Sequence, residues 1–203
     1  MRHVMLALLI TGCGAMGQNQ NLATSLEQSG YLADLSAEQA TIVRAAIDKD
    51  GVVGALEHPK RTAYADAEAL AEGGVETWLE SEIGPLLAAR GVAIPPIENR
   101  FLDDGSGYSI LVGDREYWLW HETAESTRSW GTASVGAFSI VNDLLEAAGA
   151  EDRLHLIGGG NDGTAWLLTP AQVEIIRMHA SRLRSEWPYI PVDDGTDWFG
   201  QPH

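Results

Sequence analysis

The feature that most constrains the fold is the stretch from Gly107 to Glu122, with the sequence GYSILVGDREYWLWHE. It holds two short segments whose side chains alternate between two faces, and they meet at Gly113-Asp114. Alternation with a period of two is typical of β-strands. A glycine at the first position of a two-residue loop suits a type II′ turn, because it accepts a positive φ. The sequence therefore predicts an antiparallel hairpin in which Ile110 faces Tyr117.

Both strands of this hairpin carry large apolar side chains on both faces, so we expect other parts of the chain to cover both. Trp118 and Trp120 are two residues apart and are predicted to share one face, and a slip of one residue would move both to the other face. Together with Trp166, they are interpreted as core residues.

The remaining pattern predicts the fold class. Helical periodicity marks residues 36–48, 61–72, 75–90, 134–148 and 169–185, and strand patterns mark 97–102, 154–157 and 164–168 in addition to the hairpin. Ser36-Ala-Glu-Gln39 and Thr169-Pro-Ala-Gln172 are capping boxes that open two of these helices. The order is three helices followed by β-β-β-α-β-β-α. Hairpins without a repeated βαβ unit predict an α+β fold, with an antiparallel sheet of two hairpins and about five strands packed with two further helices.

The domain organisation follows from shifts in composition along the 203 residues, 45% of which are hydrophobic. Pro95-Pro96 separates helical sequence from strand sequence, which suggests two structural layers of one folded unit. We expect a signal peptide at 1–12, a tether at 13–35, a helical layer at 36–94, an antiparallel α+β core at 95–188 and an acidic tail at 189–203.

The amino terminus carries the strongest indication of cellular location. Residues 1–12 combine a small basic head with the short apolar run Val4–Ile10, which is too short to span a bilayer as a helix and looks like a secretory signal. Ile10-Thr11-Gly12-Cys13 then resembles the lipobox of bacterial lipoproteins. The resemblance covers these four residues alone. It implies thioether lipidation of Cys13 and a membrane anchor through that lipid, and Gly14 after it implies an outer-membrane position facing the periplasm.

The net charge of −16 restricts the partners. An acidic surface repels phosphate backbones, so nucleic-acid binding is not expected. The same charge leaves an alternative to the lipoprotein interpretation, in which the chain is a small acidic cytoplasmic inhibitor or immunity-type protein that neutralises a basic protein partner.

Motifs for catalysis are incomplete. His121-Glu122-Thr-Ala-Glu125 lacks the second histidine of a zinc-binding helix, and the glycine-rich run 158–163 lacks the lysine of a phosphate loop. We therefore predict no catalytic residue, no metal site and no cofactor. His121 and His155 lie on different predicted strands that could meet, and a hydrolase with a strand-end site near His121, Glu122 and Asn161 stays as a further alternative.

A binding surface is the function that the sequence favours. Exposed loops held by strands are common at interfaces, and so are aromatic side chains that are partly exposed to solvent. The candidate rim residues are His121, Glu122, Trp130, Asn161, Asp162 and Trp198. Acidic turns at 103–105, 161–163 and 193–197 add weak calcium binding as an alternative. The leading hypothesis is a lipid-anchored bacterial envelope protein whose α+β domain binds or scaffolds and does not catalyse.

Overall fold

The computed structural model describes residues 21–121, 126–158, 161–180 and 187–193. The helices are α1 (Leu22–Gln28), α2 (Ala37–Asp50), α3 (Val52–Ala55), α4 (Ala67–Ala69), α5 (Val75–Trp78), α6 (Gly84–Ala88), α7 (Ser126–Ala147) and α8 (Pro170–His179), with π-helical turns η1 (Leu70–Gly74) and η2 (Leu79–Ile83). The strands are β1 (Thr62–Asp66), β2 (Ile97–Phe101), β3 (Gly107–Val112), β4 (Arg115–His121), β5 (Arg153–Ile157) and β6 (Asp162–Leu168).

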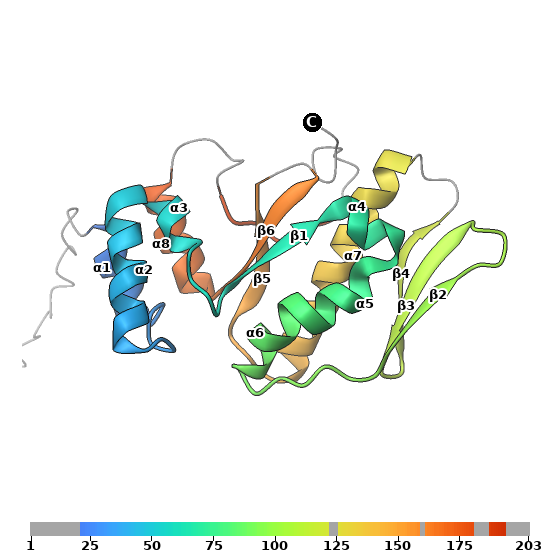
Figure 1. Cartoon of the computed structure of the whole chain (residues 1–203), viewed down its shortest axis with the longest axis horizontal. Helices are drawn as coiled ribbons and strands as arrows, with labels where there is room; N and C mark the ends of the chain where they lie inside the picture. Colours follow the sequence, from blue (N-terminus) through green and yellow to red (C-terminus); the bar gives the residue numbers. More distant parts are fainter. Residues whose placement is uncertain (1–20, 122–125, 159–160, 181–186, 194–203) are drawn as a thin grey trace, which may run out of the picture.

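The strands form two antiparallel three-stranded sheets, β1-β6-β5 and β2-β3-β4, which confirms the α+β class. The predicted order β-β-β-α-β-β-α is found from β2 to α8. In Figure 1 the long helix α7 lies between the two sheets, and it contacts both β4 and β5. Helix α7 therefore forms the partition on which both sheets pack.

Strand β1 corrects the helix that the sequence predicts at 61–72. Ala63 and Ala65 are buried, whereas Tyr64 between them is 54% exposed, so the segment alternates as a strand against β6. An alanine-rich sequence hides this alternation because alanine fits either a helix or a buried strand position. The helical part begins at Ala67, where the Asp66 side chain accepts a hydrogen bond from the backbone N–H of Ala69.

Residues 21–35 are part of the fold, which corrects this part of the tether expected at 13–35, and residues 13–20 lie outside the described chain. Asn21 caps α1, and Leu26 and Tyr31 are fully buried. They belong to a hydrophobic cluster that α1, α2 and α3 form with Trp166 and the helix α8. The capping box at Ser36 and the one that opens α8 are both formed as predicted.

The larger hydrophobic cluster combines residues from both sides of Pro95-Pro96. Leu79 and Ile83 from the helical segment pack in the same core as Ile110 of β3 and Phe138 of α7. The boundary therefore does not separate two packing units, and it does not separate helices from strands, because β1 before it pairs with β6 after it. No helix among the described residues has both the length and the apolar character needed to cross a membrane.

A buried polar network joins the amino-terminal helices to the sheet β1-β6-β5. The backbone N–H of Lys60 donates to Nδ1 of His58, so the proton of the neutral imidazole lies on Nε2, which is 3.0 Å from the carbonyl oxygen of Tyr31. Nε2 is also 3.3 Å from Oδ1 of Asp34. Burial lowers the pKa of His58 to about 4, although Asp34 acts in the opposite direction. His58 is therefore a neutral core histidine.

Next to it, Arg61 and Arg90 share the carboxylate of Asp152. Nη1 of Arg61 lies 2.8 Å from Oδ1, and Nε of Arg90 lies 3.3 Å from Oδ2. Burial acts to raise the pKa of Asp152, but the two guanidinium groups outweigh it and hold that pKa below its usual range. This triad connects β1, the end of α6 and the start of β5.

Candidate functional site

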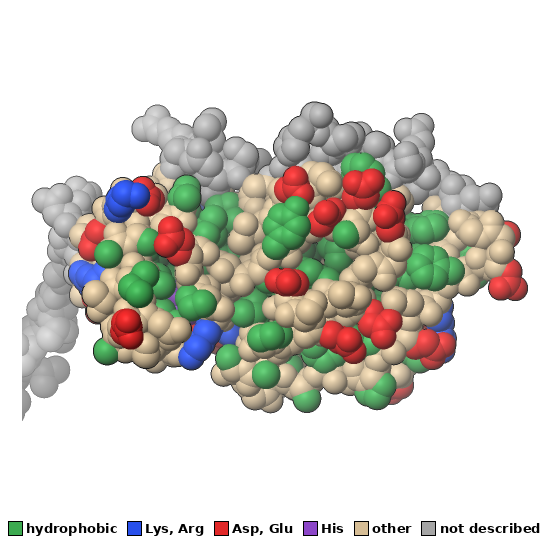
Figure 2. Space-filling view, viewed as in Figure 1, with side chains coloured by type: hydrophobic (Ala, Val, Ile, Leu, Met, Phe, Trp, Pro, Cys, Tyr) green, Lys and Arg blue, Asp and Glu red, His purple; other side chains and the backbone are tan. Residues whose placement is uncertain are grey.

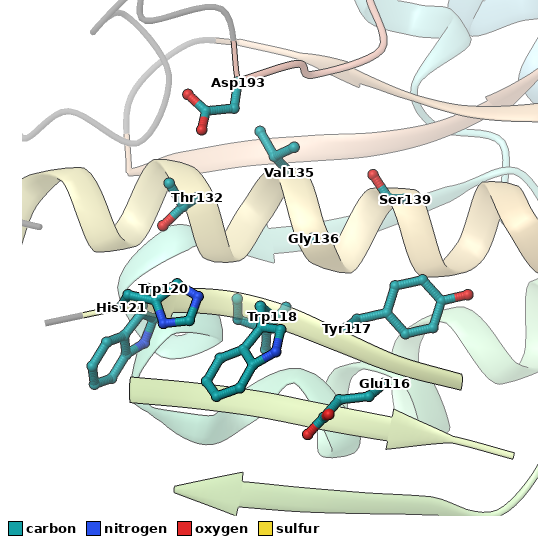
Figure 3. A pocket seen from close by; sticks show the side chains of 11 residues that line it. Glu116, Tyr117, Trp118, Trp120, His121, Thr132, Val135, Gly136, Ser139 and Asp193 are labelled. Carbon is teal, nitrogen blue, oxygen red and sulfur yellow. The ribbon is translucent and has the colours of Figure 1, made fainter. Parts of the chain in front are cut away.

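The candidate site is a groove of about 550 Å³ along α7 at the edge of the sheet β2-β3-β4 (Figure 3). Its lining includes Glu116, Trp118 and His121 of β4, Thr132, Val135 and Ser139 of α7, and Asp193. In Figure 3 the helix α7 lies between the β4 side chains and Asp193. We call this the β4–α7 groove. It combines an aromatic wall with carboxylates on both sides of the helix.

The hairpin β3–β4 sets the aromatic wall. Gly113 has a φ of 64° and Asp114 does not have a positive φ, the combination of the predicted type II′ turn, and Ile110 pairs with Tyr117 as predicted. Beyond this pair the register shifts, because Ser109 pairs with Trp118 whereas Tyr108 pairs with Trp120. Leu119 is therefore the extra residue of a β-bulge.

The bulge corrects the prediction that Trp118 and Trp120 share a buried face. A bulge re-aims the side chains that follow it. Leu119 is 1% exposed, and Trp120 packs on the core and donates its indole N–H to the carbonyl of Ala71 at 2.9 Å. Trp118 is instead 44% exposed and faces the groove.

Trp118 stacks on His121, with ring centroids 4.3 Å apart and planes inclined by 23°. A Cβ on Gly107 would lie 3.2 Å from the Trp118 ring and 3.0 Å from Leu102, so the missing side chain of this glycine leaves space for both. The indole is thus fixed on two sides while much of it stays in contact with solvent. An exposed tryptophan held in this way is typical of binding surfaces.

The charges at the groove are predominantly negative. Glu116 accepts a hydrogen bond from the Ser109 hydroxyl at 2.9 Å and lies 3.8 Å from Arg100. Asp143, next to the groove, pairs with Arg115 at 2.6 Å and accepts from the Tyr117 hydroxyl at 3.0 Å.

Burial and the bond to Asp143 together raise the pKa of Tyr117 to about 12. Tyr117 is therefore a neutral donor at the groove near pH 7.

The contact between α7 and β4 depends on Gly136. A Cβ at this position would lie 2.5 Å from Cδ2 of Leu119 and 3.6 Å from the carbonyl oxygen of Trp118. The helix thus lies directly against β4 at Trp118. Because β4 is the outer strand of its sheet, α7 covers part of the edge that a further strand would need.

The predicted rim residues do not lie together. His121 lines the β4–α7 groove. Asn161 and Asp162 instead hold the end of β1 and the start of α4: Asn161 accepts from the backbone N–H of Glu68, and Asp162 accepts from the Tyr64 hydroxyl. Asp162 lines a separate, largely apolar hollow beside α3.

The other predicted residues have different outcomes. Trp130, expected in a connection before a helix at 134, lies within α7, which starts eight residues earlier, and packs half-buried against the core. His155 is buried on β5, so it lies in the other sheet from His121 and the two form no pair. Cys13, Glu122 and Trp198 lie outside the described residues.

The acidic turns have structural explanations where they are described. The Asp104 carboxylate accepts hydrogen bonds from the backbone N–H and the hydroxyl of Ser106, which closes the turn between β2 and β3. In the described part of the chain, no group of three or more His, Cys, Asp or Glu residues is placed to hold a metal ion.

Three groove residues were not identified from the sequence as a site. The sequence pattern assigns Trp118 to the core, indicates no role for Glu116, and places Asp193 only in an acidic turn that could bind calcium. The sequence does contain a signal that Trp118 is exposed. Glu116 and Trp118 are two residues apart and so lie on the same face of the strand, and a carboxylate indicates that this face is in contact with solvent.

Comparison of the chain with protein-family models, with curated proteins and with solved structures finds no match. The function must therefore be inferred from the geometry of the groove.

Proposed function

We propose that this chain is a lipid-anchored protein of the bacterial cell envelope whose α+β body binds a partner at the β4–α7 groove without catalysing a reaction. The observation that carries the binding proposal is the exposed Trp118–His121 stack next to Glu116. The anchor is inferred from the lipobox-like residues that end at Cys13. Attached acyl chains would hold the chain stably, since two such chains already suffice.

The folded start of the chain gives the anchor a short reach. Asn21 already caps α1, so eight residue steps separate it from Cys13. Fully extended, a chain of this length spans about 28 Å. The lobe of α1 and α2 would therefore lie within roughly one hydrocarbon-core thickness of the membrane surface.

The groove lies far from that lobe. Figure 1 shows α1 and α2 at one end of the longest axis of the molecule and β2, β3 and β4 at the other end. An anchor at the α1 end leaves the β4–α7 groove accessible to a partner on the side away from its own bilayer. This arrangement supports a binding role more than a role at the lipid surface.

The anchor is tested by intact mass and fractionation in the native host. We expect the wild-type protein in the membrane fraction with acyl chains on Cys13, and Cys13→Ser in the soluble fraction. An intact initiator methionine with a free thiol would refute the anchor and favour the alternative of an acidic cytoplasmic partner protein.

The binding site is tested by the size of the native assembly in mild detergent. We expect the wild-type protein in a particle larger than one processed, acylated chain in its detergent micelle, and Trp118→Ala in the smaller particle. Tyr64→Ala removes an aromatic side chain of similar exposure elsewhere and serves as the matched control. Equal particle sizes for wild type and Trp118→Ala would refute the site.

A further inference from the structure

We infer that the β4–α7 groove takes a cationic segment of a partner protein, with an arginine side chain placed against Trp118. This inference rests on the proposed function, since it names the partner chemistry of the same site. It follows from the charges around the groove, from the exposed aromatic stack and from the position of α7 against β4.

The charges favour a cation. Glu116 and Asp193 line the groove, and neither lysine nor arginine is among its described lining residues. Among the described residues two arginines lie nearby, and both are engaged: Arg100 pairs with Glu98 and approaches Glu116, and Arg115 pairs with Asp143. The described carboxylates of Glu98, Glu116, Asp143 and Asp193 outnumber these two guanidinium groups, so the described charges make the field at the groove negative. A positively charged partner segment would be attracted to it.

The aromatic stack favours arginine over lysine. A planar guanidinium can lie on an indole face and still donate hydrogen bonds to a carboxylate, whereas an ammonium group acts as a point charge. In the groove, Trp118 provides the ring, and Glu116 and Asp193 provide acceptors. The Arg115 side chain already makes this contact in the same hairpin, since its guanidinium carbon lies 4.6 Å from the centroid of the Tyr117 ring.

The position of α7 determines how the segment binds. Because α7 approaches the Trp118 carbonyl at Gly136, a partner cannot extend the sheet along this part of β4. Binding by strand addition needs a free row of backbone groups. The segment must instead lie over Val135 and Ser139 on α7 and bind through its side chains.

A competing acidic surface must be controlled for. Between residues 62 and 89 the chain contains six acidic residues and no lysine or arginine, and Glu68, Glu72, Glu80 and Glu82 are exposed there. Figure 2 also shows many more acidic than basic side chains on the face that it presents. A polycation could bind these helices without specificity, so the test must separate the two surfaces.

The test measures binding of a fluorescent Arg-Gly-Arg-Gly-Arg-Gly peptide to the full chain in detergent by anisotropy. We expect Trp118→Ala to weaken binding about three- to thirty-fold, the range that a cation–π contact supplies. Glu116→Gln should weaken it as well, and the lysine peptide of the same spacing should bind less tightly. Tyr64→Ala and Glu80→Gln should leave the affinity unchanged.

Several results would overturn the inference while leaving the groove as a site. Equal binding of a Glu-Gly peptide would exclude a cationic partner, and loss of binding in Glu80→Gln but not in Glu116→Gln would place the cation on the helices. A dimer in analytical ultracentrifugation that Trp118→Ala dissociates would make a second copy of the chain the occupant. Failure of the proposed function is recognised separately, because the native particle would then be insensitive to Trp118→Ala.

Discussion

Acidification should destabilise the fold through His58. The imidazole has an ordinary pKa of 6.5, and burial lowers it to about 4 in the folded chain. Above pH 6.5 it is neutral in both states, so its contribution to stability is complete. As the pH falls from 6.5 to 4, His58 binds a proton in the unfolded chain but stays neutral in the folded chain. The free energy of unfolding therefore decreases.

The size of the effect follows from the difference between the two pKa values. Each unit corresponds to about 1.4 kcal/mol, so a difference of about 2.5 units amounts to about 3 kcal/mol, fully lost near pH 4. His155, whose pKa is also lowered by burial, contributes to the same pH range. The contribution of His58 must therefore be obtained as a difference between two proteins.

The assay is urea unfolding at pH 7, 6, 5 and 4 for wild type and His58→Gln. The variant loses stability at pH 7, because the ring and its bond to the Tyr31 carbonyl are removed, but its stability should decrease less steeply below pH 6.5. His179→Gln, at an exposed position of α8, is the matched control and should follow the wild-type curve. Parallel curves for wild type and His58→Gln would refute the assignment of a buried neutral imidazole.

Three further substitutions test individual contacts by urea unfolding at pH 7. Asp152→Asn leaves its two arginine partners buried without a counter-charge and should cost about 3 kcal/mol. Tyr31→Phe removes the hydroxyl that accepts the indole N–H of Trp166 at 2.9 Å and should cost about 2 kcal/mol. Gly136→Val places carbon atoms where Leu119 lies and should cost about 2 kcal/mol through the displaced α7. A change below about 0.5 kcal/mol in any of them would contradict the contact it removes.

Local sequence signals predicted much of the secondary structure. The two hairpins, the turn at Gly113 and the capping boxes at Ser36 and Thr169 depend on residues close together in the chain, and all are present. The α+β class follows from their order. These features are readable because backbone geometry and capping bonds are determined within a few residues.

The features that were missed depend on distant partners. Strand β1 forms because β6 offers a pairing edge, although the alanine-rich segment itself resembles a helix. The amino-terminal residues fold because Tyr31 reaches Trp166, 135 positions later. A tether-like composition does not reveal such a contact.

The candidate site was missed for a related reason. Strict alternation along β4 assigns Trp118 and Trp120 to one face, and the bulge at Leu119 separates them. A bulge depends on how two strands pair, so the sequence of one strand alone does not predict it. His121 was predicted as a binding residue and lines the groove, but its stacking partner was assigned to the core.

The central claim is that a partner binds at Trp118, and photo-crosslinking in native envelopes tests it most directly. A benzophenone side chain replaces Ser139, which is exposed on α7 and lines the groove with Trp118, in one strain and Met178, which is 72% exposed on α8, in another. We predict a discrete adduct from position 139 and none from position 178. An adduct from position 178 with none from position 139 would contradict the account.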